Sequence, residues 1–327
     1  MKRNFSLLML AVVAVLAMVS CGGSGSSNNS SPYTGVRTAA VITQQNADNI
    51  VEQAYQGTDA ASSFNLLLSP STEGVPSTTE ANNAATAIRP KLLSLAKLFK
   101  NATGSALAQQ SQTNRSPRAV VTESGTEYPP GGGSFTYTLS LDDQTGVFSG
   151  SLVFNNCRGD FGEFISGTIN VSGVYDINTD VFENINISTT GITISDGYVS
   201  LSGSGSVIIV VNNPATITFD FYIRNNTTGK TVWVENFIIN MTEGIGFIEI
   251  TVSGKIYLHD YGWVIVSTPT PFHFISGNFT PSSGIMIFTG SSNSKAKLTV
   301  IDTSTYSVSV DGNGDGAYEN SWTHPWI

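Results

Sequence analysis

The sequence has few of the residues that usually carry chemistry or form covalent cross-links. Its 327 residues include only two cysteines and three histidines. His259, His273 and His324 are not paired at i, i+4 or with cysteine, so no transition-metal spacing is present. The motifs G-x-S-x-G, G-x-x-x-x-G-K-[ST] and H-E-x-x-H are also missing. We therefore assign no catalytic residue, and we expect no required cofactor.

Basic residues are scarce as well. There are 15 Lys and Arg against 24 Asp and Glu, which gives a net charge of −9. Binding to nucleic acid depends on clustered Lys and Arg that neutralise phosphates. We therefore expect no nucleic-acid partner.

One long apolar run is present, from Leu7 to Val19, and it follows Lys2 and Arg3. This layout is typical of a secretory signal, and the run is too short to span a membrane comfortably. We therefore predict a signal peptide over residues 1–20, after which 13 basic and 24 acidic residues leave a net charge of −11.

The end of the signal, Met18-Val19-Ser20-Cys21, is similar to the lipobox of bacterial lipoproteins, where the cysteine becomes the lipidated first residue. Gly22 follows, whereas aspartate at this position commonly retains lipoproteins in the inner membrane. We predict lipidation of Cys21, a membrane partner through that lipid, and a location at the outer membrane. The alternative is a plain secretory signal whose cysteine is incidental.

The next segment, residues 21–35, has the Gly, Ser and Asn composition of a flexible tether. If Cys21 carries lipid, Cys157 has no partner within the chain. A single thiol of this kind is more often buried and inert than catalytic.

Residues 36–133 are interpreted as a helical segment followed by a polar linker. Between 36 and 55, apolar residues recur at helical spacing, and Gly57 is a natural stop. Ser77 to Glu80 has the spacing of a capping box, and a second apolar stripe continues to Phe99. We therefore expect two amphipathic helices, with the linker beginning at Asn101.

Beyond Ser134 the period changes from 3.6 to 2, in segments rich in Val, Ile, Thr, Tyr and Phe with turn residues between them. Strands are expected near 134–142, 146–155, 163–175, 181–188, 197–211, 215–225, 231–242, 246–258, 262–268, 284–290 and 295–301. Their short connections predict antiparallel neighbours in a meander.

Several glycines, among them Gly167, Gly173 and Gly254, share the apolar face of their strands. Glycine on this face marks strong curvature or a close backbone approach. The predicted fold is therefore mainly β: a long curved antiparallel meander over 134–327, an open or closed barrel-like sheet, with the two helices packed on its apolar face. A lipid-facing barrel, with apolar residues outside, would leave those helices without an apolar partner.

The stretch from Val310 to Trp322 begins like a calcium loop. Asp311, Asn313 and Asp315 alternate, Gly316 and Ala317 follow, and Glu319 could contribute directly or through water. Position 12, which is a bidentate glutamate in an EF-hand, is Trp322 here. The candidate metal ligands are Asp311, Asn313, Asp315, Ala317 and Glu319. The alternative is an Asx-rich hairpin turn without an ion.

The lipobox, TAAVITQQNADNIVEQAY, GGGSFTYTLSLDDQTGVFSGSLVFNNC and VDGNGDGAYE together resemble a group of uncharacterised cell-envelope lipoproteins of delta-class proteobacteria. The resemblance implies location and fold and brings no activity. In such relatives a cysteine often precedes the Gly-rich start of the sheet, and the resemblance implies that it pairs with the one that ends the FNNC strand. Here Tyr128-Pro129-Pro130 occupies that place, which puts the pairing in doubt for Cys157.

Three functional hypotheses follow. The leading one is a non-catalytic envelope lipoprotein with a structural or binding role and an unknown protein, glycan or lipid partner. The second is a carrier that holds a lipid or other apolar ligand in a curled sheet. The third, a glycan hydrolase, would need distant carboxylates such as Glu235 and Glu249 to face one cleft. A sugar platform at Tyr257, His259, Tyr261 and Trp263 is less favoured than a simple hairpin.

Overall fold

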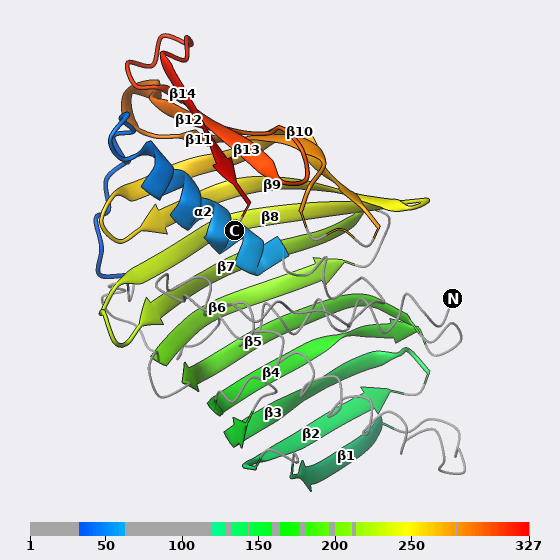
Figure 1. Cartoon of the computed structure of the whole chain (residues 1–327). Helices are drawn as coiled ribbons and strands as arrows, with labels where there is room; N and C mark the ends of the chain where they lie inside the picture. Colours follow the sequence, from blue (N-terminus) through cyan, green and yellow to red (C-terminus); the bar gives the residue numbers. More distant parts are fainter. Residues whose placement is uncertain are drawn as a thin grey trace. The chain divides into compact units, whose positions relative to one another are not determined.

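The computed structural model describes residues 33–62, 120–128, 132–142, 144–158, 164–176, 181–195, 200–210, 214–276, 278 and 280–326. These residues form fourteen antiparallel strands whose order follows the sequence from β1 to β14, one α-helix and one 3-10 turn (Figure 1). The predicted β-meander is confirmed. The chain divides into two compact units, with the boundary inside β7 (Ala215–Asn225), and each unit is described by itself.

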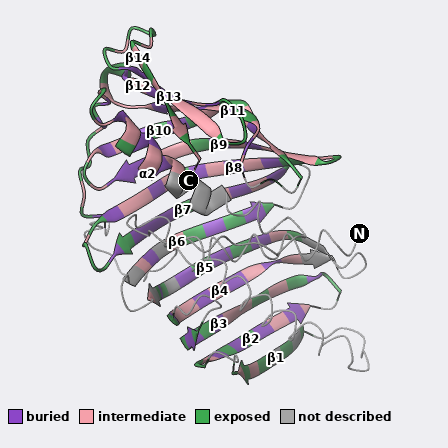
Figure 2. Cartoon of the chain, in the orientation of Figure 1, coloured by how far each residue is buried: buried purple, intermediate pink, exposed green. Residues whose placement is uncertain are grey.

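The first unit contains six whole strands and the end of β7. The strands are β1 (Val120–Glu127), β2 (Ser134–Asp142), β3 (Val147–Arg158), β4 (Phe164–Asp176), β5 (Val181–Ser195) and β6 (Ser200–Val210). Burial alternates along them, as β2 illustrates: Phe135 and Tyr137 are buried, whereas Thr136 and Thr138 are exposed (Figure 2). The period of 2 in the sequence therefore corresponds to one apolar and one polar face.

Two glycines on the apolar face lie where the strand register shifts. Gly167 has φ +134°, and a Cβ there would overlap the carbonyl oxygen of Gly191 in β5. In the second unit, Gly254 has φ +148° and faces a bulge in the neighbouring strand, where Asn236 also has positive φ. Both sites need a backbone without a side chain, so the predicted close approach is confirmed.

The second unit contains residues 30–62, the start of β7 and everything from Lys230 onward. Its elements are α2 (Ala47–Ser62), β8 (Thr231–Gly244), β9 (Phe247–Leu258), β10 (Gly262–Ile275), β11 (Ser283–Thr289), η1 (Ser291–Asn293), β12 (Lys295–Val300), β13 (Thr305–Asp311) and β14 (Asn320–Pro325). The helix packs against β9, β12 and β13 (Figure 1). Among the helix side chains that the structure describes, those of Ala47, Ile50, Val51 and Ala54 are buried.

The helical prediction needs correction at both ends. Residues 36–43 are extended, and the helix begins only at Ala47 and runs past Gly57 to Ser62. The extended part pairs with backbone of the sheet: the N–H of Trp263 donates to Thr38, and the N–H of Ala40 donates to Trp263. The segment is rich in β-branched residues, which suits an extended chain.

Other expectations differ in smaller ways. The described residues contain one α-helix where two were expected, and the second expected helix, near 77–99, lies outside them. The region interpreted as a linker contains β1, a polar strand that the sequence did not signal. Predicted strand 262–268 extends to Ile275, and no described helix is both long and apolar enough to cross a membrane.

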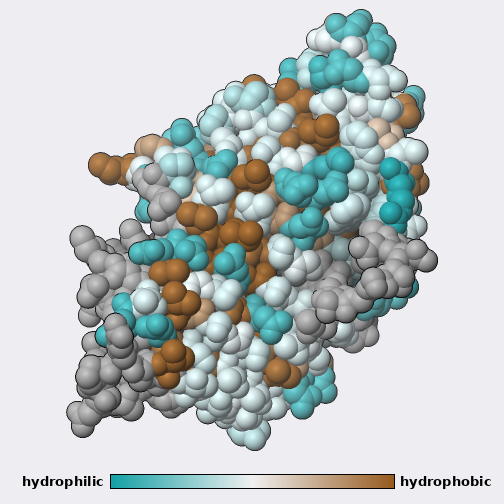
Figure 3. All heavy atoms as spheres, turned by 180° about the vertical axis from the view of Figure 1, so that it is seen from behind, coloured by the Kyte–Doolittle hydropathy of each residue, from teal (hydrophilic) through white to brown (hydrophobic). Residues whose placement is uncertain are grey.

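The face seen in Figure 3 carries polar and apolar side chains, and several of the apolar ones adjoin near its centre. Large apolar residues with substantial exposure include Val153, Ile208 and Ile265, which lie between buried neighbours on their strands. Single exposed apolar residues are normal for a folded protein and do not by themselves indicate a partner.

Residues 33–43, which we call the strap, pair beside the start of β10, and Tyr33 packs on the otherwise polar face of β8 and β9. Tyr33 is 2% exposed, and its ring lies 5.5 Å from that of Tyr257, which stacks on Trp233 at 4.3 Å. The hydroxyl of Tyr33 donates to the carbonyl of Val36, and burial raises the pKa of Tyr33 well above its usual value. Tyr33 therefore helps to bury Tyr257, which the alternation alone would expose, while Trp233 stays partly exposed.

We predict that Tyr33→Ala lowers the free energy of unfolding of the second unit by about 3 kcal/mol, because a large buried ring is lost. Urea unfolding followed by tryptophan fluorescence measures this. Tyr128→Ala is the matched control, since Tyr128 is 77% exposed, and it should change stability by less than about 0.5 kcal/mol. Equal effects of the two substitutions would show that the strap does not stabilise the sheet.

Candidate functional site

The acidic loop joins β13 to β14 and is organised around Asp311. This residue is 0% exposed, and each of its carboxylate oxygens accepts a backbone hydrogen bond. Oδ1 accepts from the N–H of Gly314 at 2.7 Å, and Oδ2 accepts from that of Gly316 at 2.9 Å. These bonds satisfy a buried charged group that would otherwise destabilise the fold.

The other predicted ligands lie in the same loop. Asn313 Oδ1 accepts from the N–H of Asp315, and Asp315 Oδ1 accepts from that of Ala317. Glu319 Oε2 accepts from the N–H of Gly312 at 3.2 Å. One carboxylate oxygen from each of Asp311, Asp315 and Glu319 lies within 4.8 Å of the other two.

This geometry makes the loop an Asx-rich hairpin turn that is held by its own hydrogen bonds. The acidic groups also converge closely enough to serve as ligands, and each carboxylate oxygen has a second lone pair. Trp322, at position 12, lies in β14 and supplies no carboxylate. Calcium binding by this loop therefore stays a prediction.

We expect Asp311→Asn to lower the free energy of unfolding by about 2 kcal/mol even in chelator, because two hydrogen bonds to a buried carboxylate are weakened. Asp315→Asn, at an exposed position, is the control and should cost much less. Thermal melts of each protein in chelator and in millimolar calcium separate the two roles. A calcium-dependent rise in the midpoint that Asp315→Asn abolishes would assign an ion to the loop.

Cys157 lies at the end of β3 and is a free, fully buried thiol. Its Sγ donates to the carbonyl oxygen of Ser134 at 3.0 Å, and burial raises the pKa of the thiol. The thiolate is the reactive form of cysteine, so a raised pKa and burial both oppose reaction.

We predict that Cys157 in the native protein reacts with iodoacetamide at pH 8 at least about tenfold more slowly than in urea. The measurement is made on a chain carrying Cys21→Ser, so that Cys157 is the only thiol. Labelling at similar rates in both conditions would show that the thiol is accessible and would argue against a purely structural role.

The geometry does not support two of the weaker predictions, the sugar platform and the pair of glycosidase carboxylates. Tyr257 of the suggested sugar platform is buried beneath the strap, and the Nδ1 of His259 lies 3.1 Å from the hydroxyl of Thr231. Lys255 Nζ lies 2.8 Å from Glu235 Oε2, with which it forms a salt bridge. Glu249 Oε1 has a different neighbour, His273 Nδ1, at 3.6 Å.

Glu235 and Glu249 are also too far apart to form one glycosidase site. Glu235 pairs in register with Lys255, which lies six residues from Glu249 along β9. At 3.3 Å per residue this is about 20 Å, whereas paired glycosidase carboxylates lie roughly 5 to 10 Å apart. This pair is therefore wrong as a catalytic pair.

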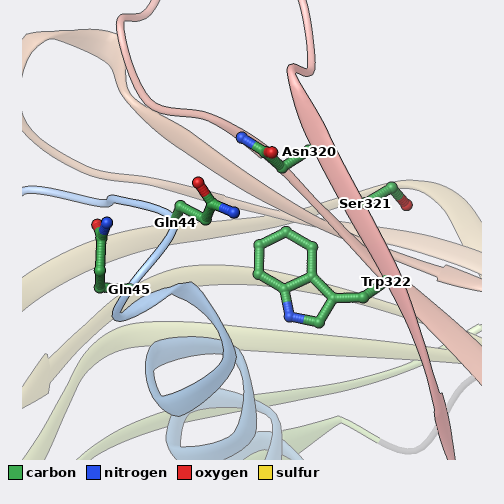
Figure 4. Close-up of a pocket in the computed structure, with 5 residues that line it drawn as sticks. All are labelled: Gln44, Gln45, Asn320, Ser321 and Trp322. Atoms are coloured by element: carbon green, nitrogen blue, oxygen red, sulfur yellow. The ribbon is translucent and has the colours of Figure 1, made fainter.

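A hollow that the sequence did not reveal lies between the turn before α2 and the last strand. Its volume is about 580 Å³, and it is open to solvent (Figure 4). The lining residues are Gln44, Gln45, Asn320, Ser321 and Trp322. Gln44 and Gln45 are exposed, whereas Asn320 and Trp322 are partly exposed.

Asp48, in the first turn of α2, fixes the two aromatic side chains of β14 beside the hollow. Trp322 Nε1 donates to Asp48 Oδ2 at 2.6 Å, and His324 Nε2 lies 3.1 Å from Asp48 Oδ1. His324 stacks on Tyr306, whose pKa is raised by burial and by the nearby Glu52 and Asp48 carboxylates. The helix and the last strand are thus joined by hydrogen bonds.

The signal for this site in the sequence was weak but present. Trp322, His324 and Trp326 alternate at i, i+2 and i+4, which is the pattern of a strand with one aromatic face. Asp48, the partner of Trp322 and His324, lies 274 residues before Trp322, and no local pattern connects the two.

Comparisons of the chain with protein-family models, with curated proteins and with solved structures find no match in any of the three. The resemblance to envelope lipoproteins therefore stays a prediction.

Proposed function

We propose that this protein is a lipid-anchored bacterial envelope lipoprotein, held at the outer membrane through Cys21, whose folded part has a non-catalytic binding or structural role. The observation that carries the proposal is the lipobox-like end of the signal segment, with its cysteine followed by a Gly, Ser and Asn tether. The tether would place the folded units away from the membrane surface.

The character of the described residues supports a binding or structural role. The strands offer broad polar faces, such as the Thr122–Ser140, Ser124–Thr138 and Thr126–Thr136 hydroxyl pairs that join β1 to β2. Glu235 forms an ion pair with Lys255, and Glu249 lies 3.6 Å from His273, so the two carboxylates have separate neighbours. Surfaces of this kind offer area and hydrogen-bonding groups for a partner.

We predict that Cys21→Ser abolishes lipidation, because the cysteine sulfur is the atom to which the diacylglyceryl lipid would be attached. The full chain is expressed in a diderm host that is fed an alkyne analogue of palmitate. The wild type should carry the label and sediment with outer membranes, and the variant should be unlabelled and soluble.

Cys157→Ser is the matched control for the loss of a cysteine, and it should keep both the label and the membrane location. If Cys21→Ser is labelled as strongly as the wild type, the anchor proposal is wrong.

A further inference from the structure

We propose that the hollow between the turn before α2 and strand β14 binds a neutral carbohydrate. In this site Trp322 is the stacking surface, and Gln44, Gln45 and Asn320 are the hydrogen-bonding groups. The inference deepens the proposed function, because it rests on the binding role and names a class of ligand for it.

The chemistry of the lining selects for an uncharged ligand. The protein has a net charge of −9, yet none of the five lining residues is charged. An anionic ligand would call for Arg or Lys, and a lipid chain would call for a mostly apolar lining. The volume of about 580 Å³ lies in the range of small-molecule sites, which is roughly 300 to 1,000 Å³.

The lining residues match both the hydroxyl groups and the apolar C–H face of a sugar. Each sugar hydroxyl donates and accepts hydrogen bonds, and an Asn or Gln amide offers both an acceptor oxygen and two donor hydrogens. The C–H face of a sugar ring is apolar and packs on a flat aromatic surface, of which indole is the largest in proteins. In Figure 4 the amide groups of Gln44 and Asn320 lie on one side of the hollow and the indole of Trp322 on another.

The indole is held in place before any ligand arrives. The 2.6 Å bond to Asp48 fixes its orientation, and Asp48 is itself within 3.1 Å of His324. Behind these residues Tyr306 lies 4.5 Å from Trp326, whose ring lies 5.4 Å from Tyr55 in α2. Groups that are already ordered cost less conformational entropy when a ligand binds.

The turn that carries Gln44 and Gln45 is equally well defined. The N–H of Thr43 donates to Asn46 Oδ1 at 2.8 Å, and Asn46 Nδ2 donates to the carbonyl of Val41 at 2.9 Å. The N–H of Ala47 donates to the carbonyl of Thr43 at 3.0 Å. The backbone is therefore fixed while the two glutamine side chains remain exposed and available.

The test is titration of the detergent-solubilised full chain with cellohexaose, maltohexaose and xylohexaose, followed by tryptophan fluorescence and saturation-transfer NMR. Hexagalacturonate is the anionic probe, and a Gly-Ser decapeptide is the neutral peptide probe. We expect at least one neutral hexasaccharide to bind with a Kd of about 1 mM or tighter, which is ordinary for a small open site. Hexagalacturonate should bind at least about tenfold more weakly than that sugar, because the hollow has no cation to receive it.

Substitutions of the lining residues test whether the sugar binds in the hollow. Trp322→Ala should weaken it at least about tenfold, and Gln44→Ala and Gln45→Ala should each weaken it about three- to tenfold. Gln144→Ala, an exposed glutamine in the first unit, is the matched control and should leave the Kd unchanged. Trp322→Phe keeps a ring without the bond to Asp48 and should give an intermediate Kd, and thermal melts confirm that each variant is folded.

Three results would overturn the assignment. If none of the neutral hexasaccharides binds below about 10 mM, the site does not take carbohydrate of this kind. Binding that Trp322→Ala leaves unchanged would place the ligand elsewhere, and tighter binding of the peptide would change the ligand class. Each of these leaves the lipid anchor at Cys21 intact, so failure here is distinguishable from failure of the proposed envelope role.

Discussion

An antiparallel strand that alternates apolar and polar residues is stable only if its apolar face is covered, and both units are arranged around this constraint. In the second unit the cover includes α2, whose Ala47, Ile50, Val51 and Ala54 are at most 1% exposed. Burying a side chain such as Ile50 contributes roughly 1.5–3 kcal/mol, which exceeds a typical net hydrogen bond. Apolar coverage therefore decides where the helix must lie.

The strap determines where α2 lies along the sheet. Its backbone pairs with Trp263 through Thr38 and Ala40, and the turn at Asn46 then starts the helix. Asp48 comes one residue after the helix start, so its carboxylate is placed against β14. The location of the hollow thus follows from backbone pairing some ten residues earlier in the chain.

The sequence predicted the meander well because a period of 2 is a local property of each strand. Boundaries such as Ser134–Asp142 and Ala215–Asn225 agree closely, since turn residues bracket each run. It failed at residues 36–43, where helical spacing of Val36 and Ala40 competed with β-branched neighbours and tertiary pairing prevailed. It also missed β1, whose Thr122 and Ser124 side chains hydrogen-bond to hydroxyl groups of β2.

The cluster of acidic residues in the 311–319 loop could be predicted from the sequence because their hydrogen-bond partners lie in the same loop. The hollow could not be predicted, because the residues that line it are almost a full chain apart. This hollow includes β14, the last strand of the order, whose one neighbour among the described strands is β13. An edge strand needs something to limit further pairing, and β14 has Pro325 at its end. The bonds from Asp48 hold Trp322 and His324 of that strand, so the interaction that steadies the edge also orients the indole that faces the hollow.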